Sequence, residues 1–240
     1  MSERLWNVLT DSFLKILIPG IKITIPLTVI SFAIGLVLSL LLAVVQVANI
    51  KVLKQISQIY IWIFRGTPLL VQLFIIFFGL PRIGIVLPAF PSAIIAFSLN
   101  VAAYNAEAVR AAMLAVPQGQ IEAAYLIGMT YPQILFRIII PQAFPISFPS
   151  LFNNLISLVK DTSLASGITI VELFAKAQQE AARTFETFGL YCEAALIYLI
   201  FCTVLTWLQH VIEKHMGWKT KPGRLAALQL RIKEAETENA

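Results

Sequence analysis

Several polar side chains that could bind a charged solute lie within the most apolar parts of this chain. A zwitterionic solute needs hydrogen-bond donors for its anionic group and acceptors for its cationic group, and amides, hydroxyls and carboxylates supply both. Polar residues inside a membrane-spanning segment are costly there, so they indicate either function or helix packing. The candidates for a polar path across the membrane are Gln72, Asn100, Asn154, Asp161 and Thr162.

Other polar residues in the same segments leave alternatives open. Asn105 and Glu107 could line the same path, but hydrogen bonds between helices are the favoured interpretation for them. Lys160 and Asp161 could instead form a gate or cap at the outer rim. Arg65 could lie deep in the membrane and contact an anionic solute. Because only about ten residues separate it from the preceding lysine, a side chain that reaches back to the inner headgroups is favoured.

The chain offers no arrangement typical of catalysis. Its two histidines, His210 and His215, and its two cysteines, Cys192 and Cys202, lack further ligands at metal-binding spacing. No Gly-x-x-x-x-Gly-Lys-Ser/Thr loop is present to hold nucleotide phosphates. We therefore expect no enzymatic activity, no metal and no cofactor bound by this chain.

The composition places these residues in an integral membrane protein. Of 240 residues, 58% are hydrophobic and 13% are charged, and the mean hydropathy is +0.81. A soluble domain carries about 25% charged residues, so this chain has too little polar surface to cover an aqueous fold. The net charge of +5 is weighted to the C-terminal tail, which fits the basic cytoplasmic ends of membrane proteins and not a nucleic-acid partner.

Apolar segments of membrane length predict an all-α, polytopic fold with five spans. A bilayer core requires about 20 apolar helical residues. The spans are expected at about residues 16–45, 55–80, 86–114, 134–159 and 190–213, the second interrupted at Arg65-Gly66-Thr67-Pro68. Residues 1–218 then form one transmembrane domain, and residues 219–240 form a polar cytoplasmic tail.

The positions of lysine and arginine predict how the chain is oriented. If the segment around Glu122 is inside, the inner side holds eleven basic residues and the outer side seven. This bias favours an external N-terminus and an internal C-terminus. The polar N-terminus lacks a basic start and a small-residue cleavage site, so we expect the first span to be retained.

Three prolines, Pro141, Pro145 and Pro149, lie four residues apart in the fourth span and therefore on one helical face. Each removes a backbone donor and can open the helix. The span could be a broken helix that lines a path or a kinked helix that only packs, and the pattern favours neither.

A short polar segment between the third and fourth spans predicts a surface helix over residues 118–128. Pro117 suits the first turn, and Gly128 suits the residue after the helix end. The helix is too short to span a membrane. Alanines at 123 and 124 would let the backbone of a partner come close, although a helix lying at the lipid headgroups is the alternative.

The spacing from Glu122-Ala123-Ala124 through Gly128 to Ile138-Ile139-Ile140-Pro141 resembles the EAA loop of permease subunits in ATP-binding cassette (ABC) importers. The stretches Arg65 to Gln72, Ala103 to Glu107 and Ser157 to Leu164 are similar to permeases of polar amino-acid importers. The sequence of residues 91–100 and 171–174 is most similar to that of permeases of cystine importers.

This resemblance implies a type I ABC importer permease in a bacterial inner membrane, with the 118–128 helix coupled to the motor through Gly119, Glu122, Ala123, Ala124 and Gly128. It implies two partner ATPase subunits that hold ATP and Mg²⁺. It further implies a second permease, identical or homologous, and an extracytoplasmic amino-acid-binding protein. An ion-gradient-driven secondary transporter is the alternative, but its marks, inverted repeats and a buried carboxylate relay, are absent from the sequence.

Overall fold

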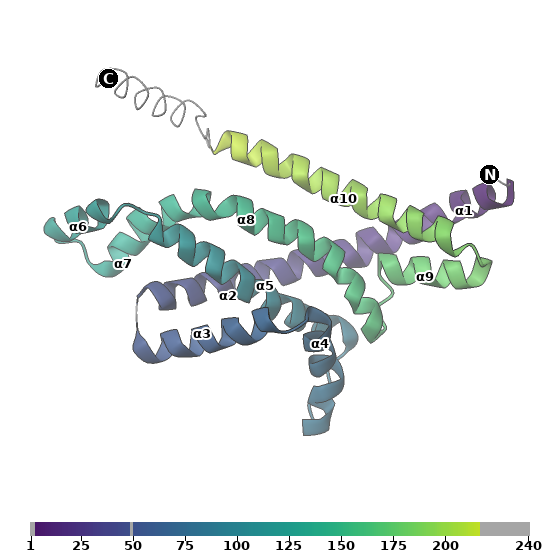
Figure 1. Ribbon diagram of the computed structural model, residues 1–240, viewed down its shortest axis with the longest axis horizontal. Coiled ribbons are helices and arrows are strands. Elements are labelled where there is room, and N and C mark those ends of the chain that lie inside the picture. Colours follow the sequence, from purple (N-terminus) through teal and green to yellow (C-terminus); the bar gives the residue numbers. More distant parts are fainter. Residues whose placement is uncertain (1–2, 49, 217–240) are drawn as a thin grey trace, which may run out of the picture.

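The computed structural model describes residues 3–48 and 50–216, and every regular element in these residues is helical. The long helices run lengthwise beside one another (Figure 1). The short helix α6 (Gln118–Leu126) lies at one end of the molecule, and α9 (Leu173–Thr184) lies with the N-terminus at the other. We call these the α6 end and the α9 end. The predicted all-α fold is confirmed.

The first helical unit is much longer than a bilayer span. α1 (Glu3–Pro19), a π-helical turn (Gly20–Thr24) and α2 (Ile25–Val47) form 45 continuous helical residues. That length is about 67 Å, against a hydrocarbon core of about 30 Å. The predicted span 16–45 lies inside it. The preceding polar residues are also helical, because Ile16 and its neighbours pack α1 against α9 and α10 (Thr187–His215).

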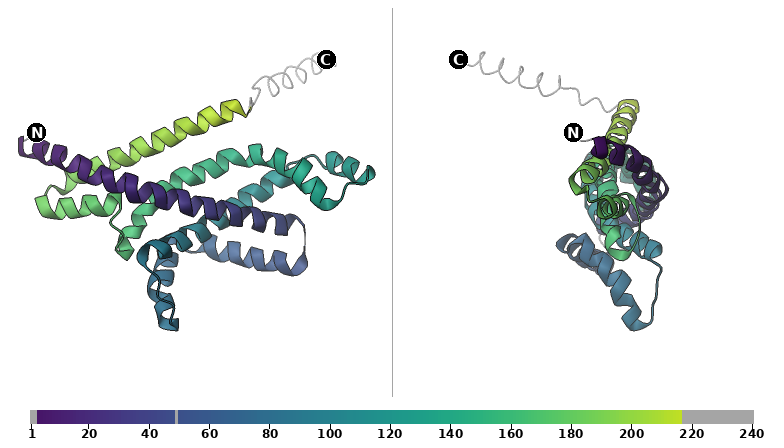
Figure 2. Two further views of the ribbon diagram at one scale, coloured as in Figure 1. Left: turned by 180° about the vertical axis from the view of Figure 1, so that it is seen from behind. Right: turned by 90° about the vertical axis from the view of Figure 1, so that its right-hand side faces the viewer.

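The predicted interruption of the second span is a sharp bend. α3 (Lys51–Gly66) ends before Thr67 and Pro68, which are extended, and α4 (Leu69–Phe74) leaves at 107° to α3. A residue before proline is disfavoured in helical conformation, which explains where α3 ends. A π-helical turn (Ile75–Gly79) and a 3₁₀ turn (Leu80–Ile83) continue α4 as an arm that points away from the bundle (Figure 2).

α5 (Ala89–Leu114) is the central helix and contacts α2, α3, α4 and α8 (Ile140–Asp161). Its contact with α2 is close because of Gly35. A Cβ there would lie only 2.7 Å from Cγ1 of Val101. Small residues that let helix backbones approach are typical of helix packing in membranes. α5 is therefore held firmly where it passes α2.

α8 is not interrupted at its prolines. α7 (Tyr131–Ile134) and a π-helical turn (Leu135–Ile139) lead without a break into α8, and Pro141 directly follows this turn, where the regular helical hydrogen bonding is already altered. Pro145 and Pro149 lie within the continuous helix, which passes into a 3₁₀ segment (Thr162–Ile168). The broken-helix alternative for the prolines is therefore wrong.

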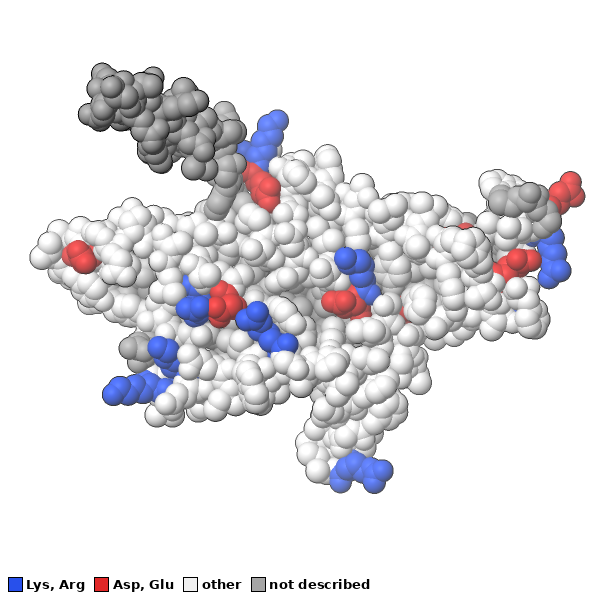
Figure 3. Space-filling view, viewed as in Figure 1, with Lys and Arg blue, Asp and Glu red and all other residues white. Residues whose placement is uncertain are grey.

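The described residues contain four helices or helix runs long and apolar enough to cross a membrane, at Glu3–Val47, Ala89–Leu114, Tyr131–Ile168 and Thr187–His215. The bent α3–α4 pair makes a fifth if it is one span. In the view of Figure 3 most of the surface is uncharged, and acidic and basic side chains gather near the ends, at the tip of the α4 arm and in small groups between. The predicted tail at 219–240 lies outside the described residues.

Candidate functional site

A pocket of about 330 Å³ opens where the bend between α3 and α4 faces α5 and α8. We call it the bend pocket. Its volume lies at the lower end of the range for small-molecule sites. Its lining combines backbone and side chains of the bend with one face each of α5 and α8: Thr67, Pro68, Leu69, Asn100, Val101, Tyr104, Asn154, Ser157, Leu158 and Asp161. Three of the five predicted path residues, Asn100, Asn154 and Asp161, therefore meet at one site.

Gln72, the fourth predicted path residue, lies behind the bend pocket and does not line it. Its side-chain nitrogen donates to the carbonyls of Phe64 (2.8 Å) and Thr67 (3.1 Å), which the end of α3 leaves without helical partners. Its side-chain oxygen accepts from Nδ2 of Asn100 at 2.9 Å. Gln72 thus closes the end of a broken helix and orients an amide that faces the pocket.

Asn154 is held in a similar way from the other side. Its Nδ2 donates to Oδ1 of Asn105 at 2.7 Å, which joins α8 to α5. Asn105 is fully buried, in agreement with the packing interpretation, and its own Nδ2 has no hydrogen-bond partner among the described residues. Each pocket amide is therefore braced by a second amide outside the pocket.

Asp161 differs from these amides because no other described residue makes a hydrogen bond or a salt bridge with its carboxylate. It is half-buried, and it faces the bend pocket. Lys160 lies beside it in sequence but lines a separate groove against α10. The two side chains form no salt bridge in the described residues, although Lys160 acts electrostatically on the Asp161 carboxylate, so the gate or cap stays an untested alternative.

Thr162, the fifth predicted path residue, is fully buried and does not reach the pocket. Its hydroxyl donates to the carbonyl of Val159 at 2.7 Å within the same helical segment. It stands one residue after Asp161, about 100° further around the helix, and so faces the interior of the chain.

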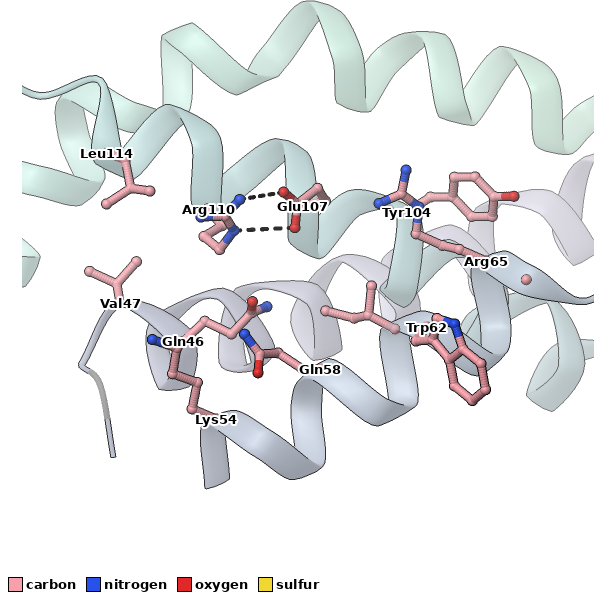
Figure 4. A pocket seen from close by; sticks show the side chains of 12 residues that line it. Gln46, Val47, Lys54, Gln58, Trp62, Arg65, Tyr104, Glu107, Arg110 and Leu114 are labelled. Atoms are coloured by element: carbon pink, nitrogen blue, oxygen red, sulfur yellow. Dashed lines mark hydrogen bonds and ion pairs between the residues drawn. The ribbon is translucent and has the colours of Figure 1, made fainter. Parts of the chain in front are cut away.

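A second and larger cavity, of about 920 Å³, extends from the bend toward the α6 end. We call it the end cavity. α3 and the end of α2 form one wall and α5 forms the other, as Figure 4 shows. Glu107 and Arg110 of α5 form an ion pair there, and Nε of Arg110 also donates to Oε2 of Glu107 at 3.2 Å.

Arg65 lines the end cavity beside the bend, with its guanidinium carbon 5.6 Å from the ring centroid of Tyr104. It lies fourteen residues after Lys51, the first residue of α3, and so about 21 Å along the helix. An arginine side chain does not cover that distance. Arg65 therefore does not reach the level of Lys51, and the expectation that it extends to the inner headgroups stays a prediction.

α6 occupies residues 118–126, within the predicted helix 118–128, and turns two faces in different directions. Ala124 is buried against residues of α5, α7 and α8, whereas Gly119, Glu122 and Ala123 are exposed. The expectation that both alanines face a partner is therefore wrong for Ala124. Its small side chain instead lets α6 lie close to its own subunit.

Gly128 ends this helix in the left-handed conformation, with φ of +82°. The backbone N–H of Gly128 donates to the carbonyl of Tyr125, and that of Met129 to the carbonyl of Ala124, each at 3.0 Å. These two bonds form a Schellman motif, in which glycine is strongly preferred. Leu126 and Ile127 beside it are 88% and 78% exposed, so the end of α6 presents an uncovered apolar surface.

Two features of the site were not predicted from the sequence. Tyr104 lines both cavities, although nothing in its sequence context distinguishes it from an ordinary lipid-facing aromatic residue. α9 was not expected, although the acidic residue Glu172 before Leu173, Ala177 and Ala181 is a helix-start signal with an apolar stripe. α9 carries too many charged residues to resemble an apolar membrane span.

The described residues hold no cluster of three or more His, Cys, Asp and Glu side chains that could bind a metal ion. The bend pocket is lined by amides, hydroxyls and one carboxylate, and α5 and the run that contains α8 are long and apolar enough to cross a membrane. This fold and this site define a membrane transport subunit.

The chain belongs to the family of binding-protein-dependent transport system inner membrane components, whose model matches residues 35–218. It is 51% identical over 212 residues to the L-cystine transport system permease protein TcyB of Bacillus subtilis (strain 168), covering 88% of this chain and 91% of that protein. It is 42% identical to the probable amino-acid ABC transporter permease protein PatM of Vibrio harveyi, over 82% and 89% of the two chains.

A crystal structure of an amino acid ABC transporter with histidines is similar in fold. The TM-score is 0.81 at 33% identity, over 90% of this chain and all (100%) of that one. The predicted permease-like fold is thus confirmed.

Proposed function

We propose that this chain is the permease subunit of an ABC importer that moves a polar amino acid, cystine by preference, into the cytoplasm by alternating access. The observation that carries the proposal is the bend pocket, in which Asp161 faces two braced amides across a cavity of about 330 Å³. Family membership supports the transport role, and the similarity to TcyB supports cystine.

The pocket chemistry suits a zwitterion. The Asp161 carboxylate can accept hydrogen bonds from an ammonium group, and charge-assisted bonds of this kind are about twice as strong as neutral ones. The side-chain amides of Asn100 and Asn154 each use one donor bond to a bracing residue and keep a second N–H. With the hydroxyl of Ser157 they offer donors for a carboxylate.

α6 is the proposed contact for the motor. Two ATPase subunits, which hold ATP and Mg²⁺, would bind the exposed face with Gly119, Glu122 and Ala123. Movement of α6 has a direct route to the pocket, because Nε2 of Gln142 on α8 donates to Oε1 of Gln120 on α6 at 2.6 Å. α8 also carries Asn154 and Asp161, so a push on α6 is transmitted along one helix.

The α6 end is then cytoplasmic, with the N-terminus outside and the C-terminus inside, in a bacterial inner membrane. The excess of basic residues on that side supports this orientation. A second permease, identical or homologous, would complete the membrane unit, and an extracytoplasmic binding protein would deliver the amino acid at the α9 end.

The test is ATP-dependent uptake of labelled cystine in liposomes that contain the permease, its ATPase partner and the binding protein. Glu122→Lys reverses a charge on the exposed face of α6 and is expected to lower uptake at least about tenfold through loss of docking. The matched control is Glu3→Lys, the same change on an exposed residue at the α9 end. Undiminished uptake in Glu122→Lys would exclude the docking role.

Two further arms of this experiment test the mechanism and the substrate. Uptake that persists without ATP and stops on addition of an ionophore would replace the importer with a secondary transporter. Excess unlabelled cystine should compete with the label more strongly than arginine or glutamine. Equal competition by all three would remove the cystine assignment and leave the importer.

A further inference from the structure

The bend pocket and the end cavity meet at one place. Tyr104 lines both of them. The bend contributes Arg65 and Gly66 to the end cavity, and Thr67 and Pro68 to the bend pocket. The two cavities therefore adjoin at Tyr104 of α5 and the last turn of α3.

The Arg65 side chain lies at this junction. Its guanidinium carbon lies 5.6 Å from the centroid of the Tyr104 ring, within the range of a cation–π contact. Figure 4 shows the two side chains beside each other, between the ribbons of α5 and α3. The two groups come from helices that differ in how firmly they are held. α5 is packed on several sides, whereas α3 ends here in a sharp bend.

We infer that Arg65 and Tyr104 form a gate that separates the bend pocket from the end cavity. The gate has a transport role only if the pocket holds the substrate, as proposed above. Tyr104 is the fixed half, on the central helix. Arg65 is the moving half, one residue before the end of α3, so a change in the bend shifts its guanidinium away from the ring.

A second partner makes the open state accessible. Glu107 lies one turn further along α5 toward the α6 end, and Arg65 attracts its carboxylate electrostatically. Glu107 is paired with Arg110 when Arg65 is stacked on Tyr104. When the gate opens, Arg65 can approach Glu107, so its charge has a partner in both positions. Two arrangements of one cation thus give a switch with two states.

Thiol labelling tests the gate without substrate or ATP. In a chain with Cys192→Ser and Cys202→Ser, a cysteine is placed in the bend pocket (Ser157→Cys) or in the end cavity (Gln58→Cys). A membrane-impermeant thiol reagent is then applied from the α6 side of oriented vesicles. Tyr104→Ala should raise the labelling rate at position 157 about tenfold and leave the rate at position 58 unchanged.

Tyr104→Phe is the matched control, because it keeps the ring and should retain slow labelling at position 157. If Tyr104→Ala does not insert into the membrane, Arg65→Gln removes the cation, keeps a planar polar group and should also speed labelling. Equal rates at position 157 in the parent and in the inserted gate variant would overturn the gate.

The outcome is separable from that of the proposed function. If Tyr104→Ala speeds labelling at position 157 but the parent protein takes up no amino acid, the gate is supported and the transport assignment is wrong. If Tyr104→Ala leaves labelling unchanged and the parent protein takes up cystine, the transport assignment is supported and the gate is wrong.

Discussion

Two carboxylates that stand eleven residues apart, Asp161 and Glu172, are removed from water in opposite ways. Glu172 is 0% exposed and accepts bonds from the backbone N–H groups of Phe174 (2.9 Å) and Ala175 (2.8 Å), which makes it the N-cap of α9. It also accepts from the hydroxyls of Tyr198 (2.8 Å) and Thr24 (3.4 Å). One side chain thus joins α9, α10 and the start of α2.

Asp161 has none of these partners. It faces a cavity, and no hydrogen bond or salt bridge joins it to another residue that the structure describes. Asp161 is only half-buried, and its carboxylate is open to the bend pocket. The comparison teaches that a fully bonded carboxylate holds helices together, whereas an unbonded carboxylate at a cavity is available to a ligand.

Burial and hydrogen bonding act in opposite directions on the pKa of Glu172. Burial raises it above the ordinary value, although the hydrogen bonds from Phe174, Ala175, Tyr198 and Thr24 favour the charged form. Because the pKa is higher in the folded state than in the unfolded chain, Glu172 contributes less stability as pH rises from about 4.3 through the folded-state pKa.

The largest expected effect follows from removal of the satisfied carboxylate. Glu172→Ala leaves two backbone donors and the Tyr198 hydroxyl without a partner in a buried site. The free energy of unfolding should fall by about 3–5 kcal/mol. It can be measured by thermal unfolding of the purified protein in detergent.

The control is Glu172→Gln, which keeps one acceptor oxygen and should cost about half as much. If Glu172→Ala were as stable as the parent, the contrast between the two carboxylates would have no structural meaning.

The second prediction concerns the unsatisfied carboxylate. Asp161→Asn breaks no protein hydrogen bond, so its stability should stay within about 0.5 kcal/mol of the parent. Uptake should fall about 10- to 100-fold, because a charge-assisted bond to the ammonium group becomes a neutral one.

Stability is compared in the same thermal assay, and uptake in the reconstituted transporter. A strong loss of stability with normal uptake per folded molecule would reverse the assignment of Asp161 and place it with Glu172.

The third prediction tests an intermediate case, since Gln72 is a satisfied polar side chain that borders the pocket. Gln72→Met keeps the length of the side chain and leaves the Phe64 carbonyl and the Asn100 amide without their partner. Stability should fall by about 1–2 kcal/mol. Cystine affinity should also weaken a few-fold, because Asn100 is no longer held in place. An unchanged affinity would show that Gln72 only caps the end of α3 and does not position Asn100.

Much of the fold could be predicted from short stretches of sequence. The lengths of the apolar segments predicted the spans, Arg65-Gly66-Thr67-Pro68 predicted the bend, and Gly128 predicted the end of α6. Each of these depends on the chemistry of a few neighbouring residues, such as a proline that cannot donate or a glycine that accepts positive φ.

Partners across the bundle could not be predicted in this way. Asn154 and Asp161 stand seven residues apart, a spacing that places them on one helical face, and both line the bend pocket. Nothing in the sequence shows, however, that α3 ends opposite that face. Ala124 and Gln72 were misplaced for the same reason, because the side that a residue turns to depends on which helix covers it. α9 was missed because it is too charged for a span, and the partners Thr24 and Tyr198 of its cap residue Glu172 are distant in sequence.

The smallest expected effect concerns a third acid, Glu180 of α9, which is satisfied by charges and not by buried donors. Its carboxylate lies 2.9 Å from Nζ of Lys176 and 2.7 Å from Arg183. The hydrogen bond from Lys176 holds the pKa of Glu180 below its ordinary value. Its contribution is therefore present above the unfolded-chain pKa of about 4.3 and is lost as pH falls through the folded-state pKa, the opposite sign to Glu172.

Glu180 itself is buried, but Lys176 and Arg183 both reach solvent, which weakens the two ion pairs, so Glu180→Gln should cost only about 0.5 kcal/mol near neutral pH. Unfolding midpoints of the parent and of Glu180→Gln, measured between pH 3 and pH 7, should converge as the solution is acidified. Lys176→Gln in the Glu180→Gln background should add less than it does in the parent if the pair is coupled. A gap that widened on acidification would show that Glu180, like Glu172, is limited by burial and not stabilised by its charges.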